Sequence, residues 1–374
     1  MTTYLPGWKK YREIVIDHTK IDSDLTDYPL LLLLSTAAGI TDADLTSIFT
    51  ELGANGLKIA VADDSGNEFY VEEVSWDQAT PLSELWTKAV AVSSASDSKV
   101  VFYYDSTHAD NSTYFGVVGS TPGKAVWDSD FVAVYHMNDV TTSTIADSTG
   151  VNNGTKKGVN EPIQAAGGIG QAQDFDGSDD SVNMPQSTLP KANDAKTLEL
   201  IVNGEGTGAD YFGAMATRVN HGGVDNELKG YLFTISIAAG TTGRLLYNHT
   251  GKGDTISLPV LNLGTDYYAA ITTGANGASV VHYLDGTSRA LTTNTIIAAN
   301  AETANGYTTI GRQSIVYSEG KISETRISNI VRSAAYIKAN QYGWTDDLIT
   351  FGAEQIAGGP MGSLANSLIA VGAI

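Results

Sequence analysis

Short runs of alternating apolar and polar residues dominate the start of the chain. Residues 8–17 (WKKYREIVID) alternate, and residues 28–35 (YPLLLLLS) form a short apolar run. Both patterns are typical of β-strands, and the leucine run is too short to span a bilayer. Residues 40–52 (ITDADLTSIFTEL) instead have apolar residues at helical spacing, so we expect a short helix there, capped by Thr41 or Asp42.

The same rhythm of strands continues to about Gly123. The runs LKIAVAD, EFYVEEVSW, ELWTKAVAV and KVVFYYD are separated by turn signals rich in Ser, Asp, Gly and Asn. Residues 119–125 (GSTPGKA) lack the spacing of a phosphate-binding loop and are better interpreted as a linker. We therefore predict a compact N-terminal β domain over residues 1–123.

After the predicted linker, strands and Gly or Asp-Gly turns follow at short spacing, as in TDYYAAITTGANGASVVHYLDGTSRAL. Hairpins of this kind indicate a β-sandwich. The run ISNIVRSAAYIKANQY has helical spacing, and LITFGAEQ is the expected last strand of the sandwich. The predicted fold class is all-β, with a second domain over residues 124–355 and an apolar tail over residues 356–374.

The stretch that organises the second domain is GGIGQAQDFDGSDDSVNM, residues 167–184. It predicts a strand, a tight turn at Gly177 and a second strand, with carboxylates at Asp176, Asp179 and Asp180 around the turn. Carboxylates two to four residues apart can converge on one hard cation. Two interpretations stay open: an Asp-rich turn held by its own hydrogen bonds, or a bound Ca²⁺.

Several pieces of this region, taken in order, resemble a known family. They are VWDSDFVAVYHMND (126–139), DSTGVNNGT (147–155), the FDGSDD turn and GKISETRISNIVRSAAYIKANQY (320–342). Residues 125–355 thereby resemble laminin-G-like domains, which have the concanavalin A-like lectin/glucanase jelly-roll fold. WKKYREIVID and VVFYYDS resemble a small β domain of unknown function that often precedes such jelly rolls.

The resemblance implies a partner for the Asp-rich turn. In the family, the turn is paired with the segment that matches residues 320–328, so Glu324 is the expected fourth ligand of a structural Ca²⁺. Ser323 stands where an Asp is common, which implies a weaker site.

The resemblance also provides a catalytic pattern with which this sequence can be compared. Glucanases of this fold place two or three carboxylates on alternate residues of one strand. The nearest stretch here is TLELIVNGE, in which Glu199 is followed by Ile201 and Asn203, so the acid and nucleophile pair is missing. We expect no enzyme activity. Glu72 and Glu73 are adjacent and face opposite sides of their strand, which suits solvation better than catalysis. We expect His136 to form hydrogen bonds within the sandwich.

Composition excludes some partners and some kinds of site. Because the formal net charge is −20, we do not expect the chain to bind phosphate backbones by charge. Because there is no cysteine, we expect neither disulfides nor thiolate metal sites. Aromatic rings can stack on sugars. The candidates for an exposed glycan site are the aromatic residues next to Gly-rich loops, namely Tyr211, Phe212, Tyr247 and Tyr317.

The tail, residues 356–374, has no charged side chain. Met361, Leu364, Leu368 and Val371 are three or four residues apart, so a helix would gather them on one stripe that requires a partner surface. With no apolar secretory signal at the start, the expected role is a bacteriophage virion component that displays a lectin-like domain. It would bind other copies or other virion proteins through the tail. The alternatives are an extracellular or cell-surface glycan-binding module and, last, a glycoside hydrolase.

Overall fold

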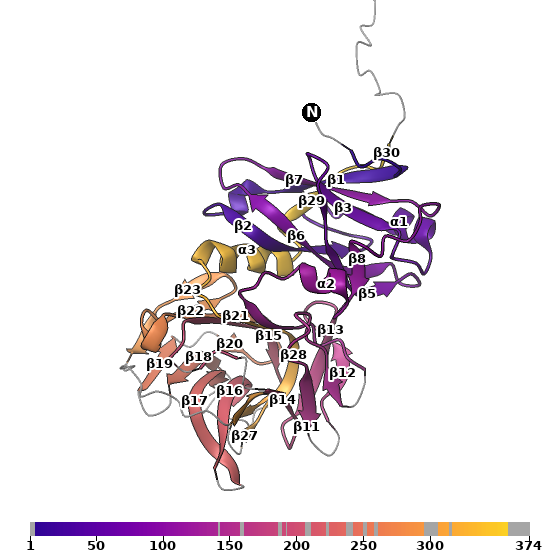
Figure 1. The fold of residues 1–374 in the computed structure, drawn as a ribbon. Helices are drawn as coiled ribbons and strands as arrows, with labels where there is room; N and C mark the ends of the chain where they lie inside the picture. Colours follow the sequence, from indigo (N-terminus) through magenta and orange to yellow (C-terminus); the bar gives the residue numbers. More distant parts are fainter. Residues whose placement is uncertain are drawn as a thin grey trace, which may run out of the picture.

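The computed structural model describes residues 4–140, 143–157, 161–185, 189–191, 193–205, 211–221, 224–236, 242–249, 253–257, 261–294, 306–313 and 316–357. Strands far outnumber helices in these ranges, so the all-β prediction is confirmed. The strands form two units, one drawn in indigo and purple and the other in magenta to orange (Figure 1). None of the helices in the described ranges has the length and apolar character needed to cross a bilayer.

The N-terminal unit consists of two facing sheets. The first has the order β29 (Ile349–Phe351), β1 (Lys10–Ile16), β7 (Ser98–Tyr104), β3 (Ile59–Asp63) and β4 (Glu68–Phe69), with β30 (Gln355–Ile356) also on β1. The second has the order β2 (Leu25–Leu34), β6 (Leu82–Val92), β5 (Val71–Asp77) and β8 (Phe115–Val117). The strands predicted from alternation in residues 8–104 are therefore confirmed.

Two short helices of this unit differ in detail from the prediction. Helix α1 (Thr46–Leu52) begins after Leu45, and the Asp44 carboxylate accepts a hydrogen bond from the Thr46 amide. Thr41 and Asp42 are therefore not its caps. The predicted linker contains helix α2 (Thr121–Ala125), whose first turn is capped by the Ser120 hydroxyl.

The end of the described chain returns to the N-terminal unit. We expected LITFGAEQ to close the sandwich, but β29 and β30 pair with β1, with Ile14 opposite Phe351 and Lys10 opposite Ile356. Helix α3 (Ala334–Trp344), capped by the Ser333 hydroxyl, packs on β2 of the same unit. The chain pattern identified a strand and a helix correctly, but the strand pairs within the N-terminal unit and the helix packs between the two units.

The second unit is a sandwich of two sheets. One has the order β12 (Ile163–Ala166), β13 (Gln171–Asp176), β28 (Glu319–Ser328), β15 (Lys196–Gly204), β21 (Asp266–Thr273), β22 (Val281–Leu284) and β23 (Thr287–Arg289), with β9 (Phe131–Tyr135) on β28; a short 3₁₀ turn, η2 (Ala275–Gly277), follows β21. The other has the order β10 (Thr144–Ile145), β11 (Gly154–Lys157), β14 (Ser181–Pro185), β25 (Gly306–Ile310), β16 (Tyr211–His221), β17 (Val224–Ser236), β18 (Thr242–His249), β19 (Gly253–Ser257) and β24 (Leu291–Asn294), with β20 (Leu261–Asn262) on β18. A separate pair is formed by β26 (Arg312–Gln313) and β27 (Val316–Tyr317).

The Asp-rich stretch joins the two sheets of the sandwich. The predicted strands are present as β13 and β14, but β13 pairs with β12 and β28 whereas β14 pairs with β11 and β25. They are therefore not partners in a hairpin. Gly177 has a φ of +76°, a left-handed conformation that glycine adopts without steric cost, and it lets the chain cross from one sheet to the other.

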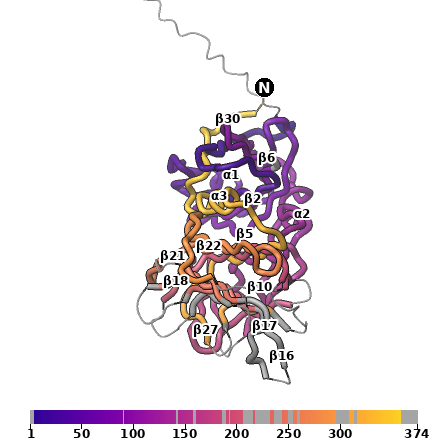
Figure 2. Tube along the Cα trace, turned by 90° about the vertical axis from the view of Figure 1, so that its left-hand side faces the viewer, coloured from indigo at the N-terminus to yellow at the C-terminus, as the bar shows by residue number. Residues whose placement is uncertain are grey.

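The apolar core of the N-terminal unit extends onto the outer face of one sandwich sheet, while the sandwich has a second core between its two sheets. Along β15, Leu198 and Leu200 point into the sandwich, whereas Ile201 belongs to the core cluster that also contains Trp86 and Phe115 of the N-terminal unit. Figures 1 and 2 both show α3 at the junction between the units. One face of the β28–β15–β21 sheet is thus covered by the N-terminal unit and α3, and this covered face carries the candidate site described next.

Candidate functional site

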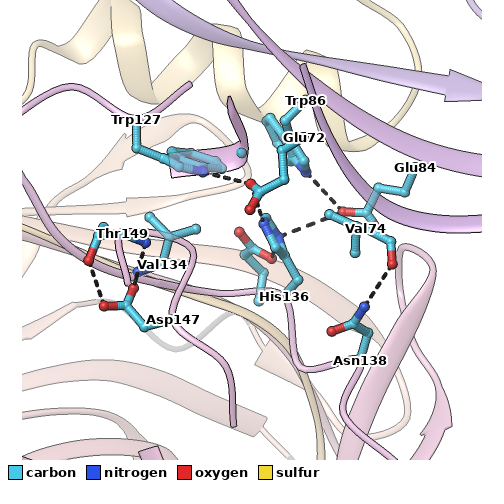
Figure 3. Close-up of polar contacts among 12 residues, drawn as sticks. Glu72, Val74, Glu84, Trp86, Trp127, Val134, His136, Asn138, Asp147 and Thr149 are labelled. Atoms are coloured by element: carbon cyan, nitrogen blue, oxygen red, sulfur yellow. Dashed lines mark hydrogen bonds and ion pairs between the residues drawn. The ribbon is translucent and has the colours of Figure 1, made fainter. Parts of the chain in front are cut away.

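Five ionisable side chains meet at the junction of the two units, and Figure 3 labels three of them, Glu72, Glu84 and His136. The N-terminal unit supplies Glu72 from β5 and Glu84 from β6; the sandwich supplies His136, which directly follows β9, and Glu324 and Arg326 from β28. All five are buried. Such a concentration of buried charge is rare unless the groups are paired.

A β-bulge in β28 places two of these side chains at the junction. Ile201 of β15 is opposite Glu324, but the next residue, Val202, is opposite Ile322, so Ser323 is the extra residue. The bulge reverses the alternation of β28. Glu324 and Arg326 therefore face the N-terminal unit, while Ile322 and Ile327 lie in the sandwich core.

His136 joins the two units through its two ring nitrogens. Its Nδ1 lies 2.9 Å from the Glu324 carboxylate, and its Nε2 lies 3.3 Å from the Glu72 carboxylate. Burial lowers the pKa of His136, but the charges and hydrogen bonds of Glu324 and Glu72 outweigh it and raise the pKa to about 10. The imidazole is therefore a cation at neutral pH, and both ring nitrogens donate.

Tryptophan N–H groups donate hydrogen bonds to the two carboxylates of the N-terminal unit, although Glu72 Oε1 has no hydrogen-bond partner in the described structure. Trp127 Nε1 donates to Glu72 at 2.7 Å, and Trp86 Nε1 donates to Glu84 at 3.0 Å. Burial raises the pKa of Glu84 to about 7, with the His136 charge acting in the opposite direction. Glu84 is thus the member of the cluster that titrates near neutrality.

Arg326 is held by one carboxylate and three indole rings. Its Nε donates to Glu324 at 2.9 Å, and the guanidinium carbon lies 4.2, 4.6 and 5.1 Å from the ring centroids of Trp86, Trp344 and Trp127. Its terminal nitrogens have no hydrogen-bond partner among the described atoms. The indole faces take the place of water around this cation.

The cluster is better suited to joining the units than to binding a metal. Carboxylate or ring atoms of Glu84, His136 and Glu324 lie within 4.8 Å of one another, which is close enough for shared coordination. However, the protein's own cations, His136 and Arg326, already occupy the positions beside the Glu324 oxygens. A divalent ion there would be repelled by both cations.

Glu199 forms a second polar contact on the same covered face. Its carboxylate accepts hydrogen bonds from the Tyr268 hydroxyl at 2.6 Å and from the Asn340 amide at 2.8 Å. These bonds connect β15, β21 and α3. Burial and the Glu199 charge raise the pKa of Tyr268, so its hydroxyl stays protonated and donates.

The Asp-rich turn brings three of the four predicted cation ligands together. Oxygens of Asp176, Asp179 and Asp180 lie within 4.8 Å of one another. Asp176 accepts a hydrogen bond from the Ser178 amide at 2.8 Å, and one oxygen of Asp180 accepts from the Asp176 amide at 3.0 Å. The turn hydrogen bonds of the first interpretation are therefore present.

Asp180 also has the unpartnered oxygen that a bound Ca²⁺, the second interpretation of this turn, requires. Its side chain is only 2% exposed, and its other carboxylate oxygen has no hydrogen-bond partner in the described structure. Burial, followed by the charges of Asp176 and Asp179, raises the pKa of Asp180 to about 6. A buried oxygen left without a partner among further carboxylates fits a hard cation such as Ca²⁺.

Glu324, the fourth predicted ligand, is not part of this group. The residue opposite Asp176 on β28 is Glu319, and the Glu324 carboxylate is bound to His136 and Arg326 at the junction. The expectation for Glu324 was wrong because the bulge at Ser323 turns its side chain to the other face of the sheet.

Two further expectations need correction. Glu72 is buried at the junction, not solvated, because the face of β5 on which it lies is covered by α2 and the sandwich. His136 does bond within the sandwich, to Glu324, but it also bonds across the junction to Glu72. Glu84, Arg326 and the three tryptophans were not singled out from the sequence. The feature that could have indicated a buried charge cluster is the occurrence of two charged residues, Glu324 and Arg326, within the largely buried strand β28.

The aromatic candidates for a glycan site do not form one group. Tyr247 is 0% exposed, so the expectation that it lies on a surface was wrong. Tyr317 is half-buried, and the guanidinium carbon of Arg312 lies over its ring, 4.9 Å from the ring centroid. Tyr211 and Phe212 lie on β16, but their side chains are outside the described part of the structure.

The fold and the junction define an all-β protein in which a two-sheet sandwich is joined to a smaller β unit through buried charge. No family model and no curated protein matches the sequence. Among solved structures, the chain is similar to domain 4 of AbnA, an extracellular GH43 arabinanase from Geobacillus stearothermophilus in complex with arabinotriose. The identity is 19% and the TM-score 0.42, over 56% of this chain and 97% of that one.

Two other solved structures show a comparable likeness. Trypanosoma rangeli sialidase, in complex with the inhibitor DANA, is 12% identical with a TM-score of 0.45, over 74% of this chain and 44% of the sialidase. A SAP-like pentraxin from Limulus polyphemus is 12% identical with a TM-score of 0.33, over 49% of this chain and 92% of the pentraxin. At these scores the likenesses carry no argument about function.

Proposed function

We propose that this chain is a non-enzymatic binding and assembly protein. One observation supports it above all: the sheet face that carries the carboxylates of the sandwich is covered. Glu199 and Glu324 are each 1% exposed, and both are bound by the protein's own side chains. Glycoside hydrolysis requires two carboxyl groups that flank a bound sugar, whereas these two carboxylates are bound by protein donors inside the junction.

A screen for hydrolysis tests the absence of catalysis. Purified protein should release no sugar from β-glucans, galactans or bacterial exopolysaccharides. Glu199→Gln is the informative variant, and Glu205→Gln, at the exposed end of the same stretch, is its matched control. Turnover that Glu199→Gln abolishes and Glu205→Gln retains would overturn the proposal.

The finer proposal is a bacteriophage virion component that presents the sandwich to a host-surface glycan. The uncharged sequence of residues 356–374 supports an assembly role, since its apolar stripe requires a partner surface. Met361, Leu364, Leu368 and Val371 all lie outside the described residues. The strongly acidic composition supports a partner other than nucleic acid.

Truncation tests the assembly role. A chain that ends at Ala357 keeps β30 and should melt at nearly the same temperature as the full chain, but it should fail to self-associate or to enter the parent particle, as judged by negative-stain imaging. A truncated chain that assembles normally would contradict the proposal. A glycan array probed with the full chain tests the attachment role separately, and the absence of any bound glycan would remove it.

We also propose that Asp176, Asp179 and Asp180 hold a structural Ca²⁺ in the sandwich. The buried, unpartnered oxygen of Asp180 supports this assignment. The ion would bind the unpartnered oxygen of Asp180 and would hold the crossing between the two sheets.

A further inference from the structure

A groove of about 590 Å³ opens in the N-terminal unit, away from the junction. It lies between β6 of one sheet and the ends of β1, β3 and β7 with β4 of the other. Its apolar walls and its charged rim are formed by Ile16, Asp63, Asp64, Phe69, Ala89, Ala91, Asp97, Ser98, Lys99 and Val100. The volume is in the range of ligand-binding pockets.

One side of this groove is an unpaired strand. β6 pairs with β2 along its whole length, up to Leu25 opposite Val92. On its other side, pairing with β5 stops at Val71 opposite Thr87, because the chain before Val71 crosses to β4 in the other sheet. No strand of the described chain pairs with residues 88–92 on that side. Their outward backbone groups are available to another extended segment.

The side chains around this edge leave room for such a segment. Ala89 and Ala91 are small and two residues apart on β6, so they contribute little bulk. Phe69, Val100 and Ile16 supply an apolar floor from the facing sheet. A strand whose alternate residues are apolar could place them on this floor while its backbone pairs with β6.

The rim of the groove is negative. Asp63, Asp64 and Asp97 contribute three carboxylates, whereas the one lysine, Lys99, is paired with Glu13 at 3.2 Å outside the groove. The hydrogen bonds that His18 donates lower the pKa of Asp97 and keep it ionised. Charge complementarity therefore favours a basic occupant.

We propose that this groove binds an extended, basic peptide segment of another protein, which adds a strand to the free edge of β6. The chain's own tail fits less well, because residues 357–374 contain no Lys or Arg to match the rim. A second copy of this chain is also disfavoured, since each copy carries a net charge of −20. The proposal concerns the N-terminal unit and is independent of glycan binding by the sandwich.

Selection from a random octapeptide display library on the immobilised full chain tests the proposal. Enriched peptides should carry Lys or Arg alternating with β-branched or aromatic residues. Ala91→Trp, which fills the groove at an exposed position, should weaken their binding at least tenfold, and Asp64→Lys, which reverses an exposed rim charge, at least threefold. Asp266→Lys makes the same charge change on the exposed surface of the sandwich and should leave binding unchanged.

Hydrogen exchange with the strongest synthetic octapeptide locates the binding site. Alternate amides of residues 88–92 should exchange at least tenfold more slowly when the peptide is bound, while strands of the sandwich should be unaffected. Three results would overturn the proposal: no enrichment of basic sequences, binding that survives both Ala91→Trp and Asp64→Lys, or displacement by a synthetic peptide of residues 357–374. The last would identify the chain's own tail as the occupant.

Discussion

Two groups of three carboxylates in this protein have opposite electrostatic surroundings. At the junction, Glu72, Glu84 and Glu324 are accompanied by two cations of the protein, His136 and Arg326. In the Asp-rich turn, Asp176 and Asp180 accept hydrogen bonds from backbone amides, and one buried oxygen of Asp180 has no hydrogen-bond partner in the described structure.

The difference separates a structural role from a binding role. At the junction, the protein's own cations and indole N–H groups bind most of the buried carboxylate oxygens, which suits a role in joining the two units, although Glu72 Oε1 has no hydrogen-bond partner in the described structure. In the Asp-rich turn, the neighbouring carboxylates of Asp176 and Asp179 repel that of Asp180, as its raised pKa reflects, and an external cation would relieve this repulsion. A count of acidic residues alone would not distinguish the two groups.

Removing the Arg326 charge should have the largest effect. Arg326→Met leaves buried Glu324 with His136 as its remaining cation, and breaking a buried ion pair on one side typically costs about 3–5 kcal/mol of unfolding free energy. Guanidinium unfolding followed by tryptophan fluorescence measures it, since three indoles surround the site.

The double variant Arg326→Met with Glu324→Leu removes both partners of this pair. It should recover a large part of the loss, because no uncompensated charge remains on Glu324. A loss below about 1 kcal/mol for Arg326→Met alone would show that the junction does not depend on this charge.

Alkaline pH should weaken the junction. A pKa of His136 raised to about 10 means that its stabilising contribution is complete below pH 6.5 and is lost as pH rises through 10. The raised pKa of Glu84, about 7, acts in the same direction between pH 4.5 and 7. The unfolding free energy should therefore fall from pH 5 to pH 9.5, with each unit of pKa shift equivalent to about 1.4 kcal/mol.

His136→Gln tests the origin of this pH dependence. The variant should be less stable at pH 6 and should show a flatter profile above pH 7, because the titrating imidazole is gone. Equal slopes for the variant and the natural sequence would assign the pH dependence to other groups.

Calcium should stabilise the sandwich by a smaller amount. At a concentration of 100 times its Kd, an ion that binds only the folded state adds about 2.7 kcal/mol. The melting temperature in millimolar calcium should exceed that in EDTA by a few degrees, and Asp180→Asn should abolish the difference. The shift should also grow as pH rises through 6, since the ion and the proton compete for Asp180.

Glu324→Gln is the control that separates the junction carboxylates from the Asp-rich turn. It should lower the basal stability, because Glu324 belongs to the junction, but it should keep the calcium shift. An unchanged melting temperature between EDTA and calcium in the natural sequence would leave the turn held by its own hydrogen bonds alone.

Local pattern was enough to predict most elements. Alternation identified β1, a short apolar run identified β2, further runs bounded by turn signals identified the strands up to β7, and helical spacing identified α3. These features depend on neighbours in sequence, because side-chain direction has a period of two in strands and 3.6 in helices. The Asp-rich turn was also predicted, since turn conformation and ligand spacing are both local properties.

The tertiary structure decided which elements meet. The pattern of LITFGAEQ specifies a strand but not its sheet, and the free edge of β1 takes it into the N-terminal unit. One extra residue at Ser323 turns Glu324 from the predicted Ca²⁺ site to the junction with His136. Sequence alone fixes how a segment can bend and which of its faces is apolar; long-range pairing and a one-residue bulge determine which charges share a buried space, because both depend on strands that lie far apart in the chain.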